Sequence, residues 1–562
     1  MNRDEVLAKL REQAEVSVLI VGAGINGIGT FRDLALNGVD VLLIDRADFC
    51  SGASAASSHM AHGGIRYLEN GEFRLVREAV QERNAMIEDA PHIVKPLPTT
   101  IPIFHLFSGL FNAPLKFLGL LDRPSERGSL VIKIGLMLYD AYTGRQRTVP
   151  RHNFMSRSES LSRWPRLNPD VIHTATYYDG AILQPERLGL ELILDAEQAN
   201  PNARALNYVS LHGRGQGTVT LQDELSGEIF QVRPRILVNA TGPWIDRANR
   251  VVGEETNFIG GTKGSHLVLN HPELREAIGG HEFFFENEDG RIVLIFPLFD
   301  RVLVGTSDIA VVDPDTVRCT EAEVDYFLGL VKRVFPTIAV DRRHVVFRFS
   351  GVRPLAASNS KSTGQITRDH EIKVLPAGVT GLPYPVYCLV GGKWTSWRAF
   401  SEQAANMCLE ALGTARQTRT RGLKIGGGRS YPAAVEEREQ VIEGISTASG
   451  GSRLRAQTLF ERYGTRALDV ARFARGNNAP LDSLPEYSRG EIAFMAAHEK
   501  VVHLDDVLLR RSMAAMLGRV THEVVREVAE VLAAQVGWDP SVRESEISRA
   551  MEILRDKHQL EL

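Results

Sequence analysis

A glycine-rich turn between two apolar segments constrains the fold of this chain more than any other feature. Residues 16–21, VSVLIV, predict a buried strand, and Gly22, Gly24 and Gly27 follow it in a GxGxxG pattern. The next residues have the apolar spacing of a helix, and the run VDVLLID then predicts a second strand that ends at Asp45. This order of strand, glycine turn, helix and strand predicts a dinucleotide-binding unit.

The residues of this turn have distinct physical roles toward a nucleotide. Gly22 permits a tight turn, Gly24 lets the backbone approach a pyrophosphate, and Gly27 allows the helix to pack closely on the strand. The helix N-terminus presents N–H groups and the positive end of its dipole to the phosphates. Asp45 is expected to accept a hydrogen bond from the adenosine ribose.

A distant segment favours FAD over NAD as the nucleotide. Residues 233–247, RPRILVNATGPWIDR, carry an apolar strand into a small-residue turn at Ala240, Thr241 and Gly242 that would close the same site. An NAD-dependent dehydrogenase usually completes its cofactor domain within one continuous stretch. The long separation therefore predicts a flavoprotein with an inserted substrate domain.

Length, charge and cysteine spacing narrow the class of protein further. A chain of 562 residues is too long for a single compact core, so its length predicts two or three domains. The formal net charge of -4 argues against a nucleic-acid binder. The four cysteines are widely spaced and the first 15 residues lack the apolar core of a signal peptide. We therefore expect a cytoplasmic protein with a short leading helix and without a metal site.

One apolar region has two interpretations. Residues 101–139 contain two apolar segments separated by a polar turn, and both are too short to span a membrane as a helix. They are typical of a buried helix pair. Alternatively, they form a surface that dips into one face of a membrane, with Lys116 and Lys133 near the headgroups.

Seven segments in order resemble the motifs of the FAD-dependent glycerol-3-phosphate dehydrogenase family. The resemblance runs from about residue 16 to about residue 405, and HEKVVHLDDVLLRRS is similar to the C-terminal cap domain of that family. The seven segments are SSHMAHGGIRYLENGEFRLVREAVQER, NATGPW, GTKGSHLVL, LVGTSD, FSGVRPL, ITRDHEI and LVGGKWTSWR.

The resemblance implies an α/β fold. It consists of a doubly wound, Rossmann-like FAD-binding domain related to amino-acid oxidases, an inserted mixed-sheet substrate domain and an all-α C-terminal domain. The implied boundaries are 1–415 for the discontinuous FAD-binding domain with its substrate domain, whose parts are mainly 85–195 and 255–365, and 416–562 for the cap.

The family oxidises sn-glycerol 3-phosphate to dihydroxyacetone phosphate and passes the electrons to a membrane quinone. The implied protein is peripheral on the cytoplasmic face of the cell membrane, with a homodimer as a possible assembly. Residues 101–139 gain weight as a docking or quinone-access surface, and the buried helix pair stays an equal alternative. An oxidase that uses oxygen stays an alternative. A flavin-binding protein that modifies tRNA or has a regulatory role is a further alternative, but the sequence lacks the long basic tract that would follow nucleic acid.

The resemblance places arginines around the substrate phosphate. Arg66, Arg353 and Arg368 match its substrate arginines, with Tyr67 beside the first. Guanidinium groups suit a phosphate dianion because their planar fork matches its oxygens.

Oxidation of a secondary alcohol also needs a base for the hydroxyl proton. His266 is the expected base, whereas His62 is expected to hydrogen-bond the turn beneath the flavin. Lys393 matches a lysine near the flavin that would stabilise developing negative charge, and Gly391 and Gly392 let the backbone approach the ring.

The serine-rich segment 51–59 is either a flexible loop or, given its position, a wrap around the pyrophosphate and flavin. We expect the second. Besides the residues discussed above, the expected cofactor contacts are Ile25, Asn26, Arg46, Ser54, Ser57, Ser58, Gly63, Gly64, Val209, Trp244, Trp394 and Thr395.

Some residues depart from the family pattern. His59 and Met60 replace lysine and leucine, and Trp394, Ser396 and Trp397 stand where the family has leucine, threonine and tyrosine. These changes leave open a larger polyol phosphate, such as erythritol phosphate, as substrate.

The C-terminal portion predicts a linker and then amphipathic helices, among them LDDVLLRRSMAAML. Asp505, Asp506, Arg510 and Arg511 could hold a metal or an anion, but we expect ion pairs on a helix surface. A capping or oligomer-forming role is expected for this domain.

Overall fold

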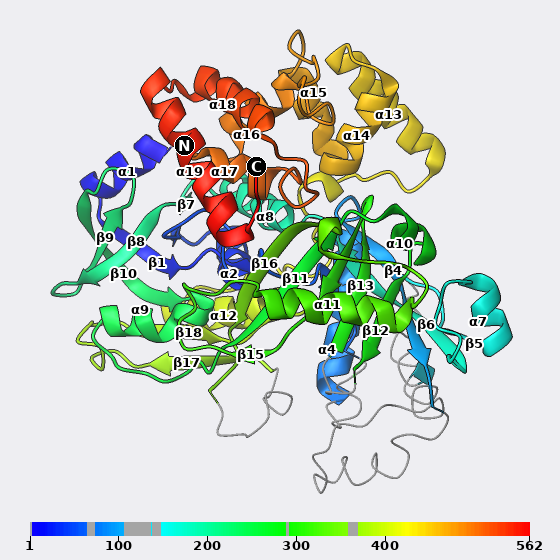
Figure 1. Ribbon diagram of the computed structural model, residues 1–562. Helices are drawn as coiled ribbons and strands as arrows, with labels where there is room; N and C mark the ends of the chain where they lie inside the picture. Colours follow the sequence, from blue (N-terminus) through cyan, green and yellow to red (C-terminus); the bar gives the residue numbers. More distant parts are fainter. Residues whose placement is uncertain (1–2, 65–72, 106–135, 138–147, 288–291, 358–368) are drawn as a thin grey trace, which may run out of the picture.

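The predicted strand, turn and helix are present in the computed structural model (Figure 1). Strand β1 spans Glu15–Val21, helix α2 spans Ile25–Leu36 and strand β2 spans Val41–Ile44. The predicted leading helix is α1, Arg3–Glu12. The structure describes residues 3–64, 73–105, 136–137, 148–287, 292–357 and 369–562.

A sheet of eight strands carries the nucleotide turn. Its strand order is β17-β18-β10-β1-β2-β7, with the hairpin β8-β9 attached to β10. The five strands from β18 to β7 run parallel, which is the arrangement of a doubly wound domain. The further strands are β7 (Ala203–Leu206), β8 (Val209–Arg214), β9 (Val219–Asp223), β10 (Ile229–Asn239), β17 (Glu371–Leu375) and β18 (Val386–Val390).

Both faces of this sheet are covered. Helix α2 packs against α8 (Pro185–Ala199) and α12 (Trp397–Leu412), and their apolar side chains share one core with the strands. Helix α1 and the β8-β9 hairpin contribute to the core on the opposite face, near α9 (Ile245–Val251). The glycine turn therefore lies at the carboxyl edge of a sheet that is buried on both sides.

A second sheet, of ten strands, forms the inserted domain and is mixed, as predicted. Its order is β15-β11-β14-β13-β12-β4-β6-β3, with β16 paired to β11 and β5 paired to β6. Within the described part of this second sheet, only the pair β12-β4 is parallel. The strands are β3 (Met60–Ala61), β4 (Val94–Ile103), β5 (Asn153–Ser156), β6 (His173–Ile182), β11 (Thr262–Leu269), β12 (Glu282–Glu286), β13 (Ile292–Leu298), β14 (Arg301–Gly305), β15 (Ile309–Ala310) and β16 (Val345–Arg353).

Helices cover the two faces of this second sheet. Helix α11 (Glu321–Val334) shares a core with one face, together with α10 (Pro272–Ala277). Residues on the other face, such as Val268 and Phe347, share a continuous core with the C-terminal helices. Two further helices lie at the end of the sheet near β4 and β5: α4 (Phe73–Asp89) and α7 (Arg157–Arg163).

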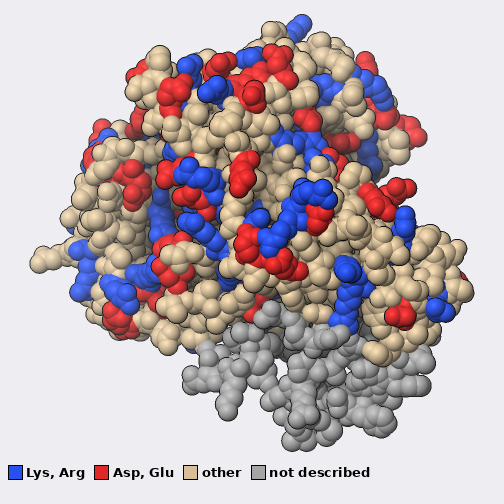
Figure 2. All heavy atoms as spheres, viewed as in Figure 1, with Lys and Arg blue, Asp and Glu red and all other residues tan. Residues whose placement is uncertain are grey.

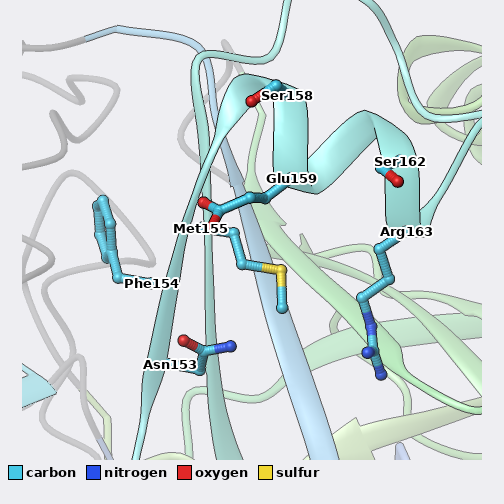
Figure 3. A pocket seen from close by; sticks show the side chains of 7 residues that line it. All are labelled: Asn153, Phe154, Met155, Ser158, Glu159, Ser162 and Arg163. Atoms are coloured by element: carbon cyan, nitrogen blue, oxygen red, sulfur yellow. The ribbon is translucent and has the colours of Figure 1, made fainter.

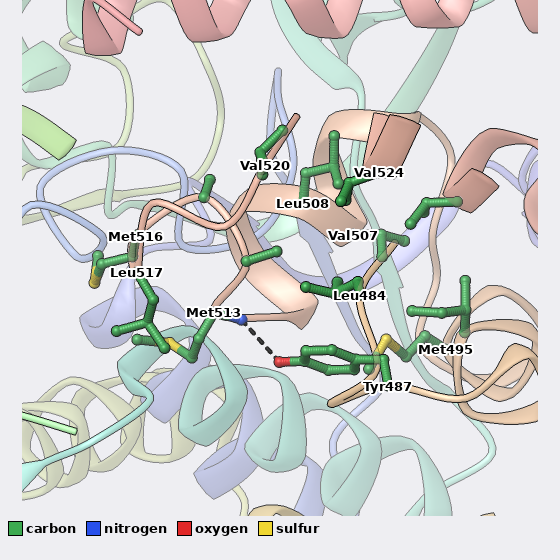
Figure 4. Packing of buried hydrophobic residues seen from close by; sticks show 14 of the residues in the cluster. Leu484, Tyr487, Met495, Val507, Leu508, Met513, Met516, Leu517, Val520 and Val524 are labelled. Atoms are coloured by element: carbon green, nitrogen blue, oxygen red, sulfur yellow. Dashed lines mark hydrogen bonds between the residues drawn. The ribbon is translucent and has the colours of Figure 1, made fainter. Parts of the chain in front are cut away.

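The C-terminal part is helical, as predicted, and lies across the top of both sheets in Figure 1. Its core is apolar, and within it the Met513 N–H donates to the Tyr487 hydroxyl at 3.0 Å (Figure 4). The helices are α13 (Val435–Ser449), α14 (Arg453–Tyr463), α15 (Ala467–Phe473), α16 (Arg489–His498), α17 (Leu504–Asp506), α18 (His522–Val536) and α19 (Pro540–His558).

Two expectations for this part are wrong. The segment LDDVLLRRSMAAML is not one amphipathic helix, because α17 leads into a wider helical turn, Val507–Arg511, that ends at Ser512. The acidic and basic residues in it do not lie on a helix surface. Asp506 is fully buried and Arg511 is 3% exposed, because both side chains face the FAD-binding domain.

The predicted linker before these helices is a tightly packed junction. A Cβ at Gly427 would collide with the backbone of Tyr463, and one at Gly428 would collide with the backbone of Asp89. The small residues therefore let two domains approach each other closely.

Most of the apolar region 101–139 lies outside the described residues. Residues 101–103 end strand β4. No helix in the described parts of the chain is long and apolar enough to cross a membrane. On the face shown in Figure 2, acidic and basic side chains are interspersed.

Candidate active site

The two segments predicted to form the nucleotide site meet in the structure. Strands β1 and β10 pair in parallel up to Val21 and Asn239, and the Ala240 N–H donates to the Val21 carbonyl at 2.8 Å. Gly22 has a φ of 102°, and a Cβ there would lie 2.6 Å from the Ala240 carbonyl oxygen. Only glycine fits this position, because both the backbone conformation and the close approach exclude a side chain.

Asp45 fastens the glycine turn from the end of β2. Its Oδ2 accepts from the Ala23 N–H at 2.7 Å and its Oδ1 accepts from the Ala47 N–H at 3.0 Å. Burial raises the pKa of Asp45 to about 6, although these backbone N–H groups lower it. Val209 lies beside it and donates its N–H to the Asp45 carbonyl at 2.7 Å. The ribose contact of Asp45 stays a prediction.

The serine-rich loop closes over the N-terminus of α2. Ser54 Oγ accepts from the Ile25 N–H at 2.9 Å, and the Ser54 carbonyl accepts from the Trp394 indole at 3.0 Å. The segment 51–59 is thus tied to both the glycine turn and the segment that follows β18. This contact favours the predicted wrap over a flexible loop.

The residues around this helix end fit a cofactor with hydroxyl and phosphate groups. Asn26 Nδ2 donates to the Gly391 carbonyl at 3.2 Å, whereas its buried Oδ1 has no hydrogen-bond partner among the described residues. Gly391 and Gly392 have φ of 81° and 88°, and a Cβ at Gly392 would collide with the Asn26 amide. An orphaned amide oxygen at a helix N-terminus, facing bare backbone, is an acceptor suited to a ribityl hydroxyl of FAD.

Arg46 and Trp244 lie together at the outer end of the turn. The Arg46 guanidinium lies 4.8 Å from the centroid of the Trp244 ring, and both side chains donate to Asp315, at 2.6 and 2.8 Å. Asp315 also pairs with Arg247 at 2.6 Å. No motif or spacing pointed to Asp315, because it lies in the loop between β15 and α11.

Arg353 and His266 project from the same face of the ten-stranded sheet. In the β11-β16 register, Thr262 lies opposite Arg353, Gly264 opposite Gly351 and His266 opposite Phe349, and side chains two residues apart share a face. A Cβ at Gly351 would collide with Ala56. The serine-rich loop therefore lies against this face.

The guanidinium of Arg353 is held by the motif LVGTSD. Its Nη2 donates to Thr306 Oγ1 and to the Ser307 carbonyl, both at 2.9 Å, and its Nη1 donates to Asp308 Oδ1 at 3.2 Å. The Ser307 hydroxyl donates in turn to Glu323 at 2.6 Å. The sequence contained this motif, but nothing in its spacing showed that it positions an arginine.

His266 is buried and neutral. Its Nε2 shares a hydrogen bond of 2.9 Å with Ser58 Oγ, and its ring stacks on Phe349 with centroids 4.8 Å apart. Burial lowers the pKa of His266 to about 3, with further contributions from Arg353 and His59. In this state His266 is a weak base.

His59, one of the departures from the family pattern, is completely buried next to this group. It has a φ of 56°, and its Nδ1 shares a hydrogen bond of 3.1 Å with the Ile182 carbonyl. Its Nε2 meets no hydrogen-bond partner in the parts of the chain that are described. Burial lowers its pKa to about 4.

The turn at 62–64 is anchored on two sides. The His62 N–H donates to Thr395 Oγ1 at 3.1 Å, and the Gly63 N–H donates to Asp179 at 2.8 Å. Gly64 has a φ of 74°, which permits the chain to leave strand β3. Lys393 is half-buried and lies between the Gly391-Gly392 pair and Thr395.

Some predicted residues are not placed. Arg66, Tyr67 and Arg368 lie outside the described residues. Ser57 accepts from the His59 N–H at 3.3 Å, Thr241 hydrogen-bonds to Asn239 and Gly242 has a φ of 59°, so these three shape backbone turns at the site.

A hollow of about 570 Å³ lies elsewhere, between β5 and α7 (Figure 3). Its polar side chains serve the local structure, since Glu159 caps α7 and Arg163 donates to His281 at 3.0 Å. It has no catalytic grouping among its described lining residues, which are Asn153, Phe154, Met155, Ser158, Glu159, Ser162 and Arg163.

Comparisons with known proteins agree with this geometry. The family described as "FAD dependent oxidoreductase" matches residues 17–382, and "C-terminal domain of alpha-glycerophosphate oxidase" matches residues 418–543. The chain is 32% identical to "Glycerol-3-phosphate dehydrogenase" of Synechocystis over 96% of both chains. It is 33% identical to the Pseudomonas aeruginosa protein of that name, over 89% of this chain and 92% of the relative.

A solved structure has the same fold. It is the glycerol-3-phosphate dehydrogenase from Bacillus halodurans complexed with FAD, with a TM-score of 0.75 and 20% identity, covering 99% of this chain and 97% of that one.

Proposed function

Because the chain belongs to the FAD-dependent glycerol-3-phosphate dehydrogenase family, with FAD as cofactor, we propose that it oxidises sn-glycerol 3-phosphate to dihydroxyacetone phosphate. One observation carries the proposal at the level of residues. The serine-rich loop contacts the glycine turn through Ser54 and the substrate face through Ser58 and His266. A cofactor held by the turn would therefore face a substrate held by Arg353.

The glycine turn and its neighbours would hold the cofactor. The turn from Gly22 to Gly27 and the N-terminus of α2 would hold the pyrophosphate, Asp45 the ribose, and Asn26 a ribityl hydroxyl. When bound, FAD supplies the acceptor for the hydride that leaves the substrate carbon.

Arg353 is the proposed anchor of the substrate phosphate, together with Arg66, Tyr67 and Arg368. Three acceptors on Thr306, Ser307 and Asp308 fix its guanidinium before substrate arrives. A fixed charge loses less side-chain entropy on binding, so more of its attraction appears as affinity.

The proposed base is His266, and its environment couples the proton transfer to substrate binding. Burial is the main cause of the lowered pKa of His266, and the positive charge of Arg353 lowers this pKa further. A phosphate dianion on Arg353 would cancel that positive charge and raise the pKa, so His266 would become a better base when substrate is present. His62 is the alternative base, because its N–H donates to Thr395, which follows Lys393 by two residues.

Lys393 would stabilise the negative charge that develops on the reduced ring or polarise the substrate oxygen. Its position, directly after the Gly391-Gly392 pair, lets its backbone come close to the ring system.

The burial of the two divergent tryptophans favours glycerol 3-phosphate over a larger polyol phosphate as the substrate. Trp397 is 3% exposed and donates from its indole to the Met86 sulfur at 3.3 Å. Trp394 is also buried and donates to the Ser54 carbonyl. Both rings are used in packing, so they do not enlarge the site.

The proposed electron acceptor is a membrane quinone. We place the enzyme on the cytoplasmic face of the membrane, as a peripheral protein, and propose a homodimer as its assembly. The test compares two acceptors for purified enzyme given glycerol 3-phosphate. Reduction of a soluble quinone analogue without peroxide release supports the dehydrogenase. Stoichiometric peroxide in air without any quinone reduction would identify an oxidase instead.

A further inference from the structure

Two consecutive arginines of the C-terminal helices reach the loop that follows strand β2. Arg510 donates from Nε to Asp48 Oδ2 at 2.6 Å. Arg511 donates from Nη1 to Oδ2 at 2.7 Å and from Nη2 to Oδ1 at 3.0 Å. A bidentate guanidinium-carboxylate contact of this kind fixes both position and orientation.

Asp48 depends on these arginines for its charge. Its side chain is completely buried, and its only other side-chain donor among the described residues is Asn207, at 2.9 Å. Although burial raises the pKa of Asp48, Arg511 and Arg510 outweigh that effect and hold it well below its usual range. Loss of either arginine would leave a buried carboxylate with reduced compensation.

The Asp48 loop is part of the frame of the nucleotide turn. On one side of Asp48, Asp45 accepts from the Ala23 N–H at 2.7 Å. On the other side, the Cys50 N–H donates to the Ala23 carbonyl at 2.9 Å. Four residues later, Ser54 accepts from the Ile25 N–H. A shift of Asp48 would therefore move the groups that shape the turn.

Arg511 is itself fixed by a second interdomain contact. Arg187 of α8 pairs with Glu499 at 2.7 and 2.9 Å and also donates to the Arg511 carbonyl at 3.1 Å. Arg511 donates from Nε to the Glu499 carbonyl at 3.0 Å. Because α8 packs directly against α2 (Figure 1), the arginine is held between the two domains.

We propose that the C-terminal helical domain takes part in FAD binding by holding the loop 45–54 in place through Arg510 and Arg511. Neither arginine needs to touch the cofactor, so both are positioning residues. The inference rests on the placement of FAD at the glycine turn proposed above.

The test titrates the full-length apoprotein with FAD and follows the quenching of flavin fluorescence. Arg511→Met is expected to raise the Kd for FAD at least ten-fold, and Asp48→Asn at least three-fold. The double variant is expected to raise it by less than the product of the two single effects, because both changes break the same contact.

Lys500→Met is the matched control. The Lys500 side chain also links the two domains, through Glu197 at 2.9 Å and the Ala205 carbonyl at 3.2 Å, and within the described residues it forms no hydrogen bond or ion pair with the loop 45–54. Its Kd for FAD is expected to stay within two-fold of the native value. Thermal unfolding of every variant checks the fold, and Asp48→Asn carries the test if Arg511→Met fails to fold, since asparagine keeps the size of the side chain.

Native affinity for FAD in both Asp48→Asn and the double variant would overturn the proposal. Gly24→Val separates this failure from a failure of the proposed cofactor site. If Gly24→Val loses FAD while the Asp48 and Arg511 variants bind it normally, only the role of the C-terminal domain is wrong. If Gly24→Val binds FAD normally, the placement at the glycine turn is wrong.

Discussion

Replacing Arg353 by alanine tests the proposed phosphate anchor. A charge-assisted hydrogen bond contributes about 1.5 to 3 kcal/mol, so losing the guanidinium is expected to cost about 3 kcal/mol of substrate binding. That corresponds to a rise in KM of roughly 100-fold, with a much smaller change in kcat. The assay is steady-state reduction of a quinone analogue over a range of glycerol 3-phosphate concentrations.

The structure adds a second component to this prediction. Asp308 lies 3.2 Å from the Arg353 guanidinium and would face the phosphate uncompensated in the variant. Repulsion between the two adds about 1 kcal/mol, which raises the KM of Arg353→Ala by roughly a further five-fold, and Arg353→Ala/Asp308→Asn should recover that factor.

Arg348→Ala is the control for this experiment. Arg348 lies on the same strand but on its other face, where it pairs with Glu321. The KM of Arg348→Ala for glycerol 3-phosphate should match the native value. A native KM in Arg353→Ala, with the flavin still bound, would refute the assignment of Arg353.

Three further predictions follow from the same geometry. Gly24→Val should yield protein without the visible flavin band. A Cβ at Gly24 would lie 3.2 Å from Ser54 Oγ, and a branched side chain would fill the space proposed for the pyrophosphate. A native flavin spectrum would contradict the proposed cofactor site. Lys393→Met should lower kcat at least 100-fold with little change in KM, measured in the quinone-analogue assay, since its charge is needed mainly in the transition state; an unchanged kcat would remove Lys393 from the mechanism. Burial lowers the pKa of His59 from 6.5 to about 4. Between these two pH values His59 is protonated in the unfolded chain but neutral in the folded protein. Stability is therefore lost as the pH falls from 6.5 toward 4, by about 2 kcal/mol at pH 5, and His59→Gln should show a smaller drop in unfolding temperature between pH 6.5 and pH 5 than the native protein.

The nucleotide half of the site could be predicted because its requirements are local. The glycine spacing, the flanking apolar runs and Asp45 lie within one short segment, where the glycines suit a backbone close to phosphates, the apolar runs suit buried strands and Asp45 suits a ribose hydroxyl. The distant turn at 240–242 could also be placed beside it, and the pairing of β1 with β10 confirms that contact.

The surroundings of Arg353 could not be predicted in this way. Thr306 and Asp308 meet it only through the pairing of strands from three separate motifs. The burial of His266, which sets its pKa, likewise depends on the stacking of Phe349 and on the position of the serine-rich loop. Such contacts are set by tertiary structure rather than by residue spacing.

In the C-terminal domain, residue spacing predicted one ion pair correctly but not its surroundings. Asp506 and Arg510 do form the expected ion pair four residues apart, at 2.6 Å. Spacing predicts that pair but not its burial, because the facing groups, Asp48 and Tyr208, come from a different domain.

The most direct test of the central claim is reduction of the bound flavin by substrate. Purified enzyme is mixed without oxygen with glycerol 3-phosphate and, separately, with erythritol phosphate, and the visible flavin band is followed. We predict fast bleaching by glycerol 3-phosphate. Bleaching by erythritol phosphate alone, or no bleaching by either ester, would contradict the proposed activity.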